Sequence, residues 1–268
     1  MQTNIDITKA LIDEPNGVLS IHQLSKKLNL PYGTAYNRLH LLYDQGIIQI
    51  LHSGKSKLCA LNPENRMTVS LLSLGAAQNT EFYLNKLPEK GIRLFKEISS
   101  TIKKYGGSWL YSTLLLSPDT LTELFSRNNT LSQRINPQEI RPSLDFFFIK
   151  ANENYDEYSN VNLAENTNQA NGVFPQAGDT TSFNTGTQNC EAYLEKQIKE
   201  VISKYGIDLD ITSMVVEEDT LIGMFSDKQD DVGLTAYTML HQSIILYGFE
   251  NFYEIAMRAF IQKLSELK

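Results

Sequence analysis

One stretch near the amino end, residues 20–61, constrains the fold of this chain more than any other part of the sequence. Ser20 and Gln23 have the spacing of a capping box, in which each residue satisfies a backbone N–H group at the start of a helix. After a short turn, apolar residues recur at helical spacing from Pro31 to Gln45, and Gly46 can end that helix because it tolerates positive φ. Two strand-like runs follow. We therefore expect two short helices joined by a tight turn and then a β-hairpin.

The second predicted helix, residues 31–45, has one apolar and one polar face. Ala35, Leu39 and Leu42 recur at helical spacing, so this face is expected to pack inward. The side chains that then point outward are those of Tyr32, Thr34, Asn37 and Arg38. In the hairpin, Lys55 and Lys57 lie near the polar turn, where they are displayed to solvent.

These features resemble the winged helix-turn-helix of bacterial and archaeal transcription regulators, the group that includes the MarR-like and ArsR-like proteins. The resemblance covers residues 1–65, and its most specific part is Leu42–Ile48, which matches the usual exit from the recognition helix into the wing. It implies that the helix at 31–45 enters the major groove of double-stranded DNA. It also implies that the hairpin at 52–57 lies on the adjacent backbone.

Charge separates this stretch from the rest of the chain. Between Ile21 and Lys57 there are five cationic side chains against one anionic side chain, Asp44, whereas the whole chain has a formal net charge of −7 at pH 7. A basic surface on an acidic protein suits a phosphate backbone at one place, while the remaining surface repels it. The pattern favours nucleic-acid binding. A module that binds another protein, or a purely structural one, is the alternative.

The residue types on the outward face suit the contacts that duplex DNA offers. The amide of Asn37 can pair bidentately with adenine, and Arg38 can contact guanine or a phosphate. Tyr32 and Thr34 suit a phosphate or a thymine methyl group. The sequence therefore predicts a sequence-specific double-stranded DNA-binding protein that regulates transcription. The candidate DNA-binding residues are Lys26, Lys27, Tyr32, Thr34, Asn37, Arg38, Lys55 and Lys57.

A helical connector is predicted at residues 66–107. Its first helix, Met67–Leu87, carries apolar residues on more than one side, and two roles are open for it. It either packs against a second copy of itself in a homodimer or joins the two domains. A homodimer would give two recognition helices the spacing of a two-fold operator. The second helix begins at Pro88 and ends at Tyr105.

Residues 108–268 alternate between strand and helix patterns, which predicts an α/β domain with a mixed sheet. Residues 151–190 contain no Lys or Arg and are rich in Asn, so we expect a disordered insertion there. The whole chain is thus expected to be an α+β winged helix domain followed by an α/β domain. Strands are predicted at 109–116, 144–149 and 207–216, and helices at 119–125, 191–205, 234–247 and 251–267.

The order of elements in residues 109–260, with the motif Leu246–Tyr253 near its end, resembles the nucleotidyltransferase-like domains that often follow a winged helix in archaea. Such a domain needs a Gly-Ser pair after its first strand. It also needs two aspartates one residue apart at its second strand, which bind two Mg²⁺ ions. Here Ser117-Pro118 follows the first strand, and only Asp145 of the aspartate pair is present, because residue 143 is a serine.

These departures imply that the domain has lost catalysis and persists as a sensing, docking or dimerising unit. Asp208 or Asp210 is the candidate for the family's third acid, but Asp145 without its neighbour cannot assemble a two-metal site. We interpret Asp145 as a capping or salt-bridged residue at a strand edge. A nucleotidyltransferase with an accessory winged helix is the alternative from another functional class.

Composition and motifs argue against several other classes of protein. No basic start precedes an apolar run, and no run approaches the ~20 apolar residues of a membrane span, so we expect a cytoplasmic protein without membrane contact. The two cysteines, Cys59 and Cys190, have no disulfide or metal spacing. His52 with Cys59 is the one weak metal pair, and we interpret both as ordinary hairpin residues. No cofactor is predicted, and the sequence identifies no effector.

Overall fold

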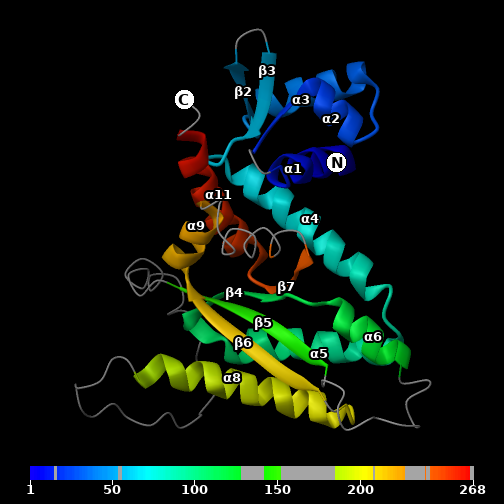
Figure 1. Cartoon of the computed structure of the whole chain (residues 1–268), viewed down its shortest axis with the longest axis vertical. Helices are drawn as coiled ribbons and strands as arrows, with labels where there is room; N and C mark the ends of the chain where they lie inside the picture. The colour runs from blue at the N-terminus through cyan, green and yellow to red at the C-terminus, as the bar shows by residue number, and fades with distance from the viewer. Residues whose placement is uncertain are drawn as a thin grey trace, which may run out of the picture.

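The computed structural model is a mixed α+β protein with two β-sheets (Figure 1). The smaller sheet lies in the amino-terminal part of the chain and the larger one in the carboxyl-terminal part. Helices between and after the sheets pack on both parts. The structure describes residues 1–14, 17–53, 56–127, 142–151, 185–207, 209–226, 239 and 242–265.

The described part of residues 1–65 contains three helices and a three-stranded antiparallel sheet. The helices are α1 (Gln2–Ile12), α2 (Ile21–Lys27) and α3 (Tyr32–Asp44), and the strands are β1 (Val18–Ser20), β2 (Ile48–Ser53) and β3 (Ser56–Leu61). Strand β3 lies between β1 and β2. The predicted pair of short helices and the hairpin are confirmed, and α3 begins and ends within one residue of its predicted bounds.

Two long helices lead from the first sheet to the second. Helix α4 (Arg66–Leu84) begins at Asn65, whose side chain accepts a hydrogen bond from the backbone N–H of Met67 at 2.8 Å. Helix α5 (Glu89–Tyr105) follows Pro88 and ends before Gly106, as predicted. Figure 1 shows α4 running from the three-stranded sheet to the region of the four-stranded sheet.

The carboxyl-terminal part is organised around a four-stranded mixed sheet in the order β6-β5-β4-β7. Strand β4 is antiparallel to both of its neighbours, and β5 is parallel to β6. The strands are β4 (Leu110–Leu115), β5 (Ser143–Lys150), β6 (Asp210–Glu217) and β7 (Ile244–Tyr247). The helices are α6 (Asp119–Arg127), α8 (Thr185–Lys204), α9 (Glu218–Ser226) and α11 (Phe249–Ser265), and a short 3-10 turn, η1 (Gly107–Trp109), precedes β4.

Side chains alternate across the four-stranded sheet, so each of its faces has its own apolar core. In β5, Phe146 and Phe148 belong to a core that includes side chains of α5 and α8. Phe147 and Ile149 face the opposite way, into a core that includes side chains of α9 and α11. Figure 1 shows α5 and α8 on one side of the sheet and α9 and α11 on the other. The sheet is therefore a central layer covered on both faces.

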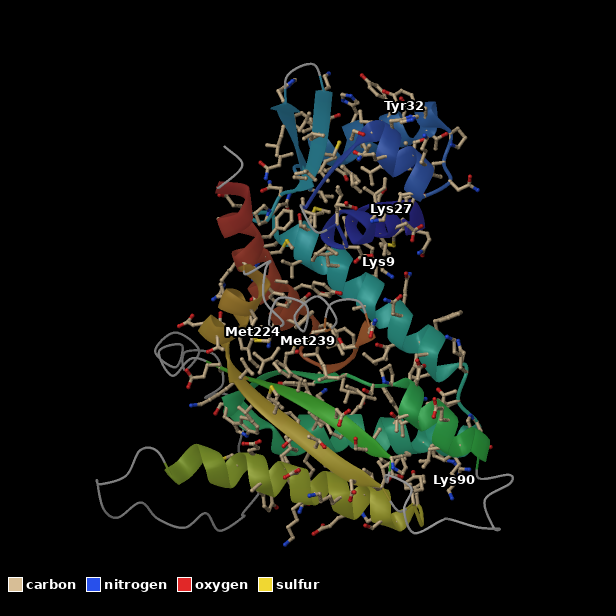
Figure 2. All side chains as sticks on the ribbon, viewed as in Figure 1. Lys9, Lys27, Tyr32, Lys90, Met224 and Met239 are labelled. Carbon is tan, nitrogen blue, oxygen red and sulfur yellow. The ribbon has the colours of Figure 1, made fainter. Side chains whose placement is uncertain are left out.

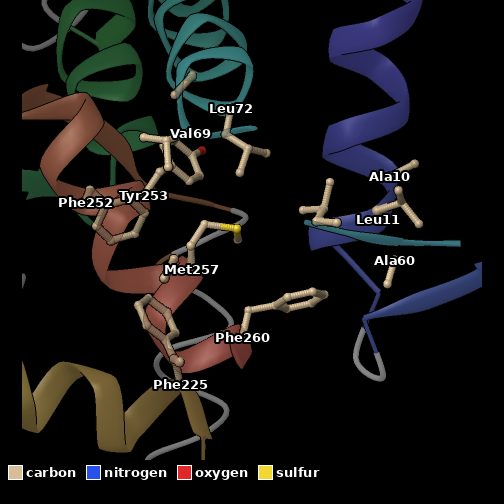
Figure 3. Close-up of a cluster of buried hydrophobic side chains, with 14 of the residues drawn as sticks. Ala10, Leu11, Ala60, Val69, Leu72, Phe225, Phe252, Tyr253, Met257 and Phe260 are labelled. Carbon is tan, nitrogen blue, oxygen red and sulfur yellow. The ribbon is translucent and has the colours of Figure 1, made fainter. Parts of the chain in front are cut away.

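The core under α11 continues into the amino-terminal part. It includes Leu11 of α1, Leu72 of α4 and Met257 of α11 (Figure 3). Phe260, near the end of α11, lies against Gly17, where an added Cβ atom would be 2.3 Å from the Cε2 atom of the ring. Gly17 has a φ of +68°, so both its conformation and its closeness to the ring require glycine. The two sheets thus share one apolar core through α4 and α11.

The prediction of a helix at residues 234–247 is wrong at its end. Residues Ile244–Tyr247 form strand β7, which pairs with β4 at the edge of the sheet. A short apolar run does not reveal its type by periodicity, and here the free edge of β4 decides it. The part of the predicted helix at 234–238, 240 and 241 lies outside the described residues.

Other elements also differ from the prediction. Helix α4 ends at Leu84 rather than Leu87, and β6 begins at Asp210 rather than at residue 207. Helix α9 directly follows β6 and was not predicted, because residues 218–226 mix acidic and apolar side chains with a central Gly223. Helix α8 begins at Thr185, although the insertion was predicted to extend to Cys190. The rest of that insertion, residues 152–184, lies outside the described residues.

Candidate nucleic-acid interface

Local hydrogen bonds set the turn between α2 and α3. The backbone N–H of Gln23 donates to Ser20 Oγ at 3.2 Å, and the N–H of Ser20 donates to Gln23 Oε1 at 2.8 Å, which is the predicted capping box. After α2, the N–H of Leu30 donates to the carbonyl of Ser25, whose hydroxyl donates back to the carbonyl of Leu30 at 2.7 Å. Asn29, between them, has a φ of +50°. These bonds fix the direction in which α3 leaves the turn.

The inner face and the end of α3 are held by the rest of the unit. The predicted inward side chains of Ala35, Leu39 and Leu42 are at most 2% exposed. After the helix, Gly46 has a φ of +70°, and its carbonyl accepts a hydrogen bond from Asn62 Nδ2 at 2.7 Å. Packing on one face and hydrogen bonds at the exit therefore leave the opposite face of α3 for another role.

The residues predicted to point outward from α3 are exposed. These are Tyr32, Thr34, Asn37 and Arg38, and Tyr32 is 53% exposed. Figure 2 shows Tyr32 at the end of the molecule opposite the four-stranded sheet. Within the described part of the chain, Arg38 takes part in no ion pair. This face is open to a partner, and the acidic carboxyl-terminal part does not cover it.

Sequence reasoning missed Tyr36, which extends the exposed face of α3. The ring centroids of Tyr32 and Tyr36 are 6.4 Å apart, and those of Tyr36 and His40 are 4.3 Å apart. Tyr36 is 38% exposed. The three rings follow one another at a spacing of four residues, which puts them on one side of a helix. This spacing is the signal in the sequence by which Tyr36 could have been found. A phenol ring at this place offers a hydroxyl group to a phosphate and an apolar face to a sugar.

Two of the predicted cations are exposed on elements next to α3 in the chain. Lys26, in the last turn of α2, and Lys57, in β3, are exposed. In the hairpin, Lys57 pairs with His52, and only the pair of Ser53 with Ser56 lies nearer the turn. Lys55 lies outside the described residues. One of these cations thus precedes α3 in the chain and the other follows it.

Lys27 is less available than its neighbour Lys26. Its Nζ atom lies 3.2 Å from Glu14 Oε2 and donates a hydrogen bond to the carbonyl of Ala10 at 3.3 Å. These contacts tie α2 to α1 and to the residues that follow it, so part of the charge of Lys27 is compensated within the protein. We therefore expect Lys27 to contribute less to phosphate binding than Lys26, although both were predicted alike.

The weak metal pair of the hairpin is not assembled. Cys59 is fully buried in β3 opposite Ile50, whereas His52 is exposed. Burial raises the pKa of the Cys59 thiol to about 11, which disfavours the thiolate that a metal ion needs. Throughout the described ranges, three or more His, Cys, Asp or Glu side chains nowhere gather closely enough to hold a metal ion.

The structure brings together two residues that the nucleotidyltransferase resemblance singles out. The hydroxyl of Ser117, after β4, donates to Asp145 Oδ2 at 3.3 Å, and the hydroxyl of Ser143 donates to Asp145 Oδ1 at 3.0 Å. Asp210 lies opposite Ser143 in the pairing of β5 with β6, and Asp208 lies outside the described residues. The placement of Asp145 at a strand edge is wrong, because Asp145 is the third residue of β5, an inner strand of the sheet, and its carboxylate accepts hydrogen bonds from two serine hydroxyls.

An open cavity of about 500 Å³ lies beside Ser117, between α4, α6 and the start of β7. Its charged lining residues are Lys86, Asp119 and Glu123. Tyr83 forms part of its wall and donates a hydrogen bond to the carbonyl of Pro118 at 2.5 Å. Burial raises the pKa of Tyr83 to about 12, so it keeps its proton as a donor. The cavity presents polar groups of both charges.

An ion pair with a buried carboxylate fixes α11 to its neighbours. Arg258 of α11 pairs with Glu218 of α9, whose side chain is 1% exposed. Desolvation raises the pKa of Glu218, and the charge of Arg258 opposes this by favouring the carboxylate. One turn before Arg258, Glu254 accepts a hydrogen bond from the hydroxyl of Tyr111 in β4 at 3.1 Å. These polar contacts position the helix that supports the amino-terminal part.

Comparison with protein-family models, with curated proteins and with solved structures finds no match to this chain. Among the helices of the described ranges, none combines the length and the apolar character needed to cross a bilayer. A function for this chain therefore has to be inferred from its residues and their geometry.

Proposed function

We propose that this protein binds double-stranded DNA sequence-specifically through a winged helix-turn-helix at residues 1–65, and that it regulates transcription. The observation that carries the proposal is the exposed outward face of α3, which bears Asn37 and Arg38. The order α1-β1-α2-α3-β2-β3 agrees with such a unit. Helix α3 has 13 residues and is therefore ~20 Å long, and the diameter of a helix with its side chains, ~10–12 Å, suits a major groove ~12 Å wide.

The chemistry of this face suits both base reading and backbone contact. The amide of Asn37 both donates and accepts, as adenine requires, and the guanidinium of Arg38 donates twice, as guanine requires. Tyr32 and Thr34 offer hydroxyl groups to phosphates. Lys26 of α2 and Lys57 of β3 are exposed cations that suit the neutralisation of backbone charge.

Selection of duplexes from a random pool with the full chain tests the proposal. The recovered duplex is then used to measure affinity by fluorescence anisotropy at several salt concentrations, with a random duplex beside it. Arg38→Ala should weaken binding to the selected duplex by ~1–3 kcal/mol and should affect the random duplex less. Lys57→Ala should weaken both alike and should lower the salt slope by about one.

Lys90→Ala is the matched control for Lys57→Ala. Lys90 is an exposed cation in α5, at the opposite end of the molecule (Figure 2). It should leave both the affinity and the salt slope unchanged. Equal small losses on selected and random DNA for Arg38→Ala would contradict the base-reading role. Absence of salt-sensitive duplex binding by the wild type would refute DNA binding and favour a unit that binds another protein.

A homodimer through α4 is part of this proposal. Three apolar side chains of α4 are exposed, namely Met67, Leu74 and Phe82, and Phe82 is 66% exposed. A second copy packed there would give two α3 helices for an operator with two-fold symmetry. Sedimentation equilibrium of the wild type and of Leu74→Glu tests this. A monomeric wild type at micromolar concentration would rule it out.

The second candidate function is that of a nucleotidyltransferase-like domain, and the contact between Ser117 and Asp145 beside the cavity favours it. We propose that this domain is a degenerate one that senses or docks rather than catalyses, because one carboxylate cannot hold two Mg²⁺ ions. Incubation with labelled nucleoside triphosphates and Mg²⁺ tests this. Transfer of label by the wild type that is lost in Asp145→Ala would establish an enzyme instead.

A further inference from the structure

Gly33 has no visible role in the packing or the backbone geometry of the described protein. It lies in the first turn of α3, and a Cβ atom added there would meet nothing within 4 Å. Its φ is not positive, so a side chain would not strain the backbone. Glycine in a helix is less favourable than alanine because the unfolded chain gains more freedom. Gly33 therefore lowers helix stability without a compensating contact inside the protein.

Most other described glycines have a structural reason. Gly46 and Gly248 have positive φ. Gly75 lets α4 pack closely on α1, because a Cβ atom added at Gly75 would lie 2.9 Å from Ile5 Cγ2. Gly223 of α9 is the other described glycine that has both free space and ordinary backbone angles. It follows the acidic first turn of α9, which repels phosphate. Of these two glycines, only Gly33 lies on the surface proposed to meet DNA.

The helical repeat places Gly33 in the middle of the outward face of α3. Gly33 and Asn37 are one turn apart, and both are exposed. At 3.6 residues per turn, Tyr32 and Tyr36 lie on one side of this row, and Thr34 and Arg38 on the other. The exposed face thus lacks a side chain at its centre, at Gly33, while the neighbouring positions carry hydroxyl groups and a guanidinium.

We infer that Gly33 is the point of closest approach between α3 and the bases of a duplex. The missing side chain lets the helix backbone sit deep in the major groove, and this depth brings the amide of Asn37 within hydrogen-bonding distance of a base edge. Protein N–H···O hydrogen bonds have donor–acceptor distances of about 2.7–3.2 Å, so a methyl group at residue 33 that holds the helix farther from the base is enough to spoil the contact. The inference rests on the proposed function and assigns Gly33 as a positioning residue within it.

Gly33→Ala and Gly223→Ala, made in the full chain, test the inference as a matched pair. Both should raise the melting temperature by about 1–3 °C, because each adds a favourable helix residue in free space. Gly33→Ala should lower the affinity for the selected duplex about tenfold. Its affinity for a random duplex should fall less, since phosphate contacts persist. Gly223→Ala should bind both duplexes as the wild type does.

Three results would overturn the inference, and they are distinguishable. Wild-type affinity of Gly33→Ala for the selected duplex, while Arg38→Ala binds weakly, rejects the role of Gly33 and keeps the proposed function. A lower melting temperature of Gly33→Ala means that the fold itself needs this glycine. Absence of duplex binding by the wild type removes both the inference and the function on which it rests.

Discussion

Replacing Phe260 with alanine tests whether α11 holds the two parts of the molecule as one cooperative unit. The ring is 6% exposed and fills the space over Gly17, whose conformation excludes a side chain. Truncating a buried phenylalanine costs about 3–5 kcal/mol. A domain has a total stability of about 5–15 kcal/mol, so the loss should be plain in urea unfolding followed by circular dichroism. We expect one transition, shifted to lower urea, in both wild type and variant.

The neighbouring Ile261 provides the control for Phe260. It belongs to the same helix and is 43% exposed, so Ile261→Ala should lower the free energy of unfolding by less than about 1 kcal/mol. Two results would refute the reasoning. One is a loss for Phe260→Ala no larger than that for Ile261→Ala. The other is wild-type unfolding in two separate transitions, which would mean that the amino-terminal part does not depend on α11.

Three other side chains have testable roles. Arg258→Ala should lower the free energy of unfolding by about 3 kcal/mol, because it leaves the buried carboxylate of Glu218 without its cation; a loss below about 1 kcal/mol in urea unfolding would contradict this. Burial raises the pKa of Glu218, so the folded state binds its proton more tightly than the unfolded state does, and stability falls as the pH rises from the ordinary carboxyl range through the raised pKa. Glu218→Gln should lack this part of the pH dependence, and parallel unfolding profiles of wild type and variant would refute it. Tyr36→Ala should weaken duplex binding by about 1 kcal/mol in fluorescence anisotropy, and Tyr36→Phe shows whether hydroxyl or ring is responsible; unchanged affinity of both variants would remove Tyr36 from the interface.

Much of the amino-terminal part could be predicted from the sequence, because its signals are local. The capping box of Ser20 and Gln23 involves residues three apart, and the inner face of α3 follows from the spacing of Ala35, Leu39 and Leu42. The same periodicity predicted the exposed face. The hairpin followed from two apolar runs around a polar turn. That this face meets DNA is still a prediction.

The carboxyl-terminal part was harder to predict because its elements depend on distant partners. Residues Ile244–Tyr247 are a strand since β4 has a free edge for them, more than a hundred residues earlier in the chain. Helix α9 is held by Phe225 packing on Phe252 and by the ion pair of Glu218. Neither relation leaves a periodic pattern in the sequence.

By itself the sequence determined which residues of α3 face solvent and, to within one residue, where α3 begins and ends. Only the tertiary structure decided that Lys27 is tied to Glu14, that Ser117 meets Asp145, and that Gly33 has no neighbour. The physical reason is range. Hydrogen bonds within a turn and side-chain spacing along a helix are written in adjacent residues, whereas contacts between remote segments and the empty space beside a residue exist only once the chain has packed.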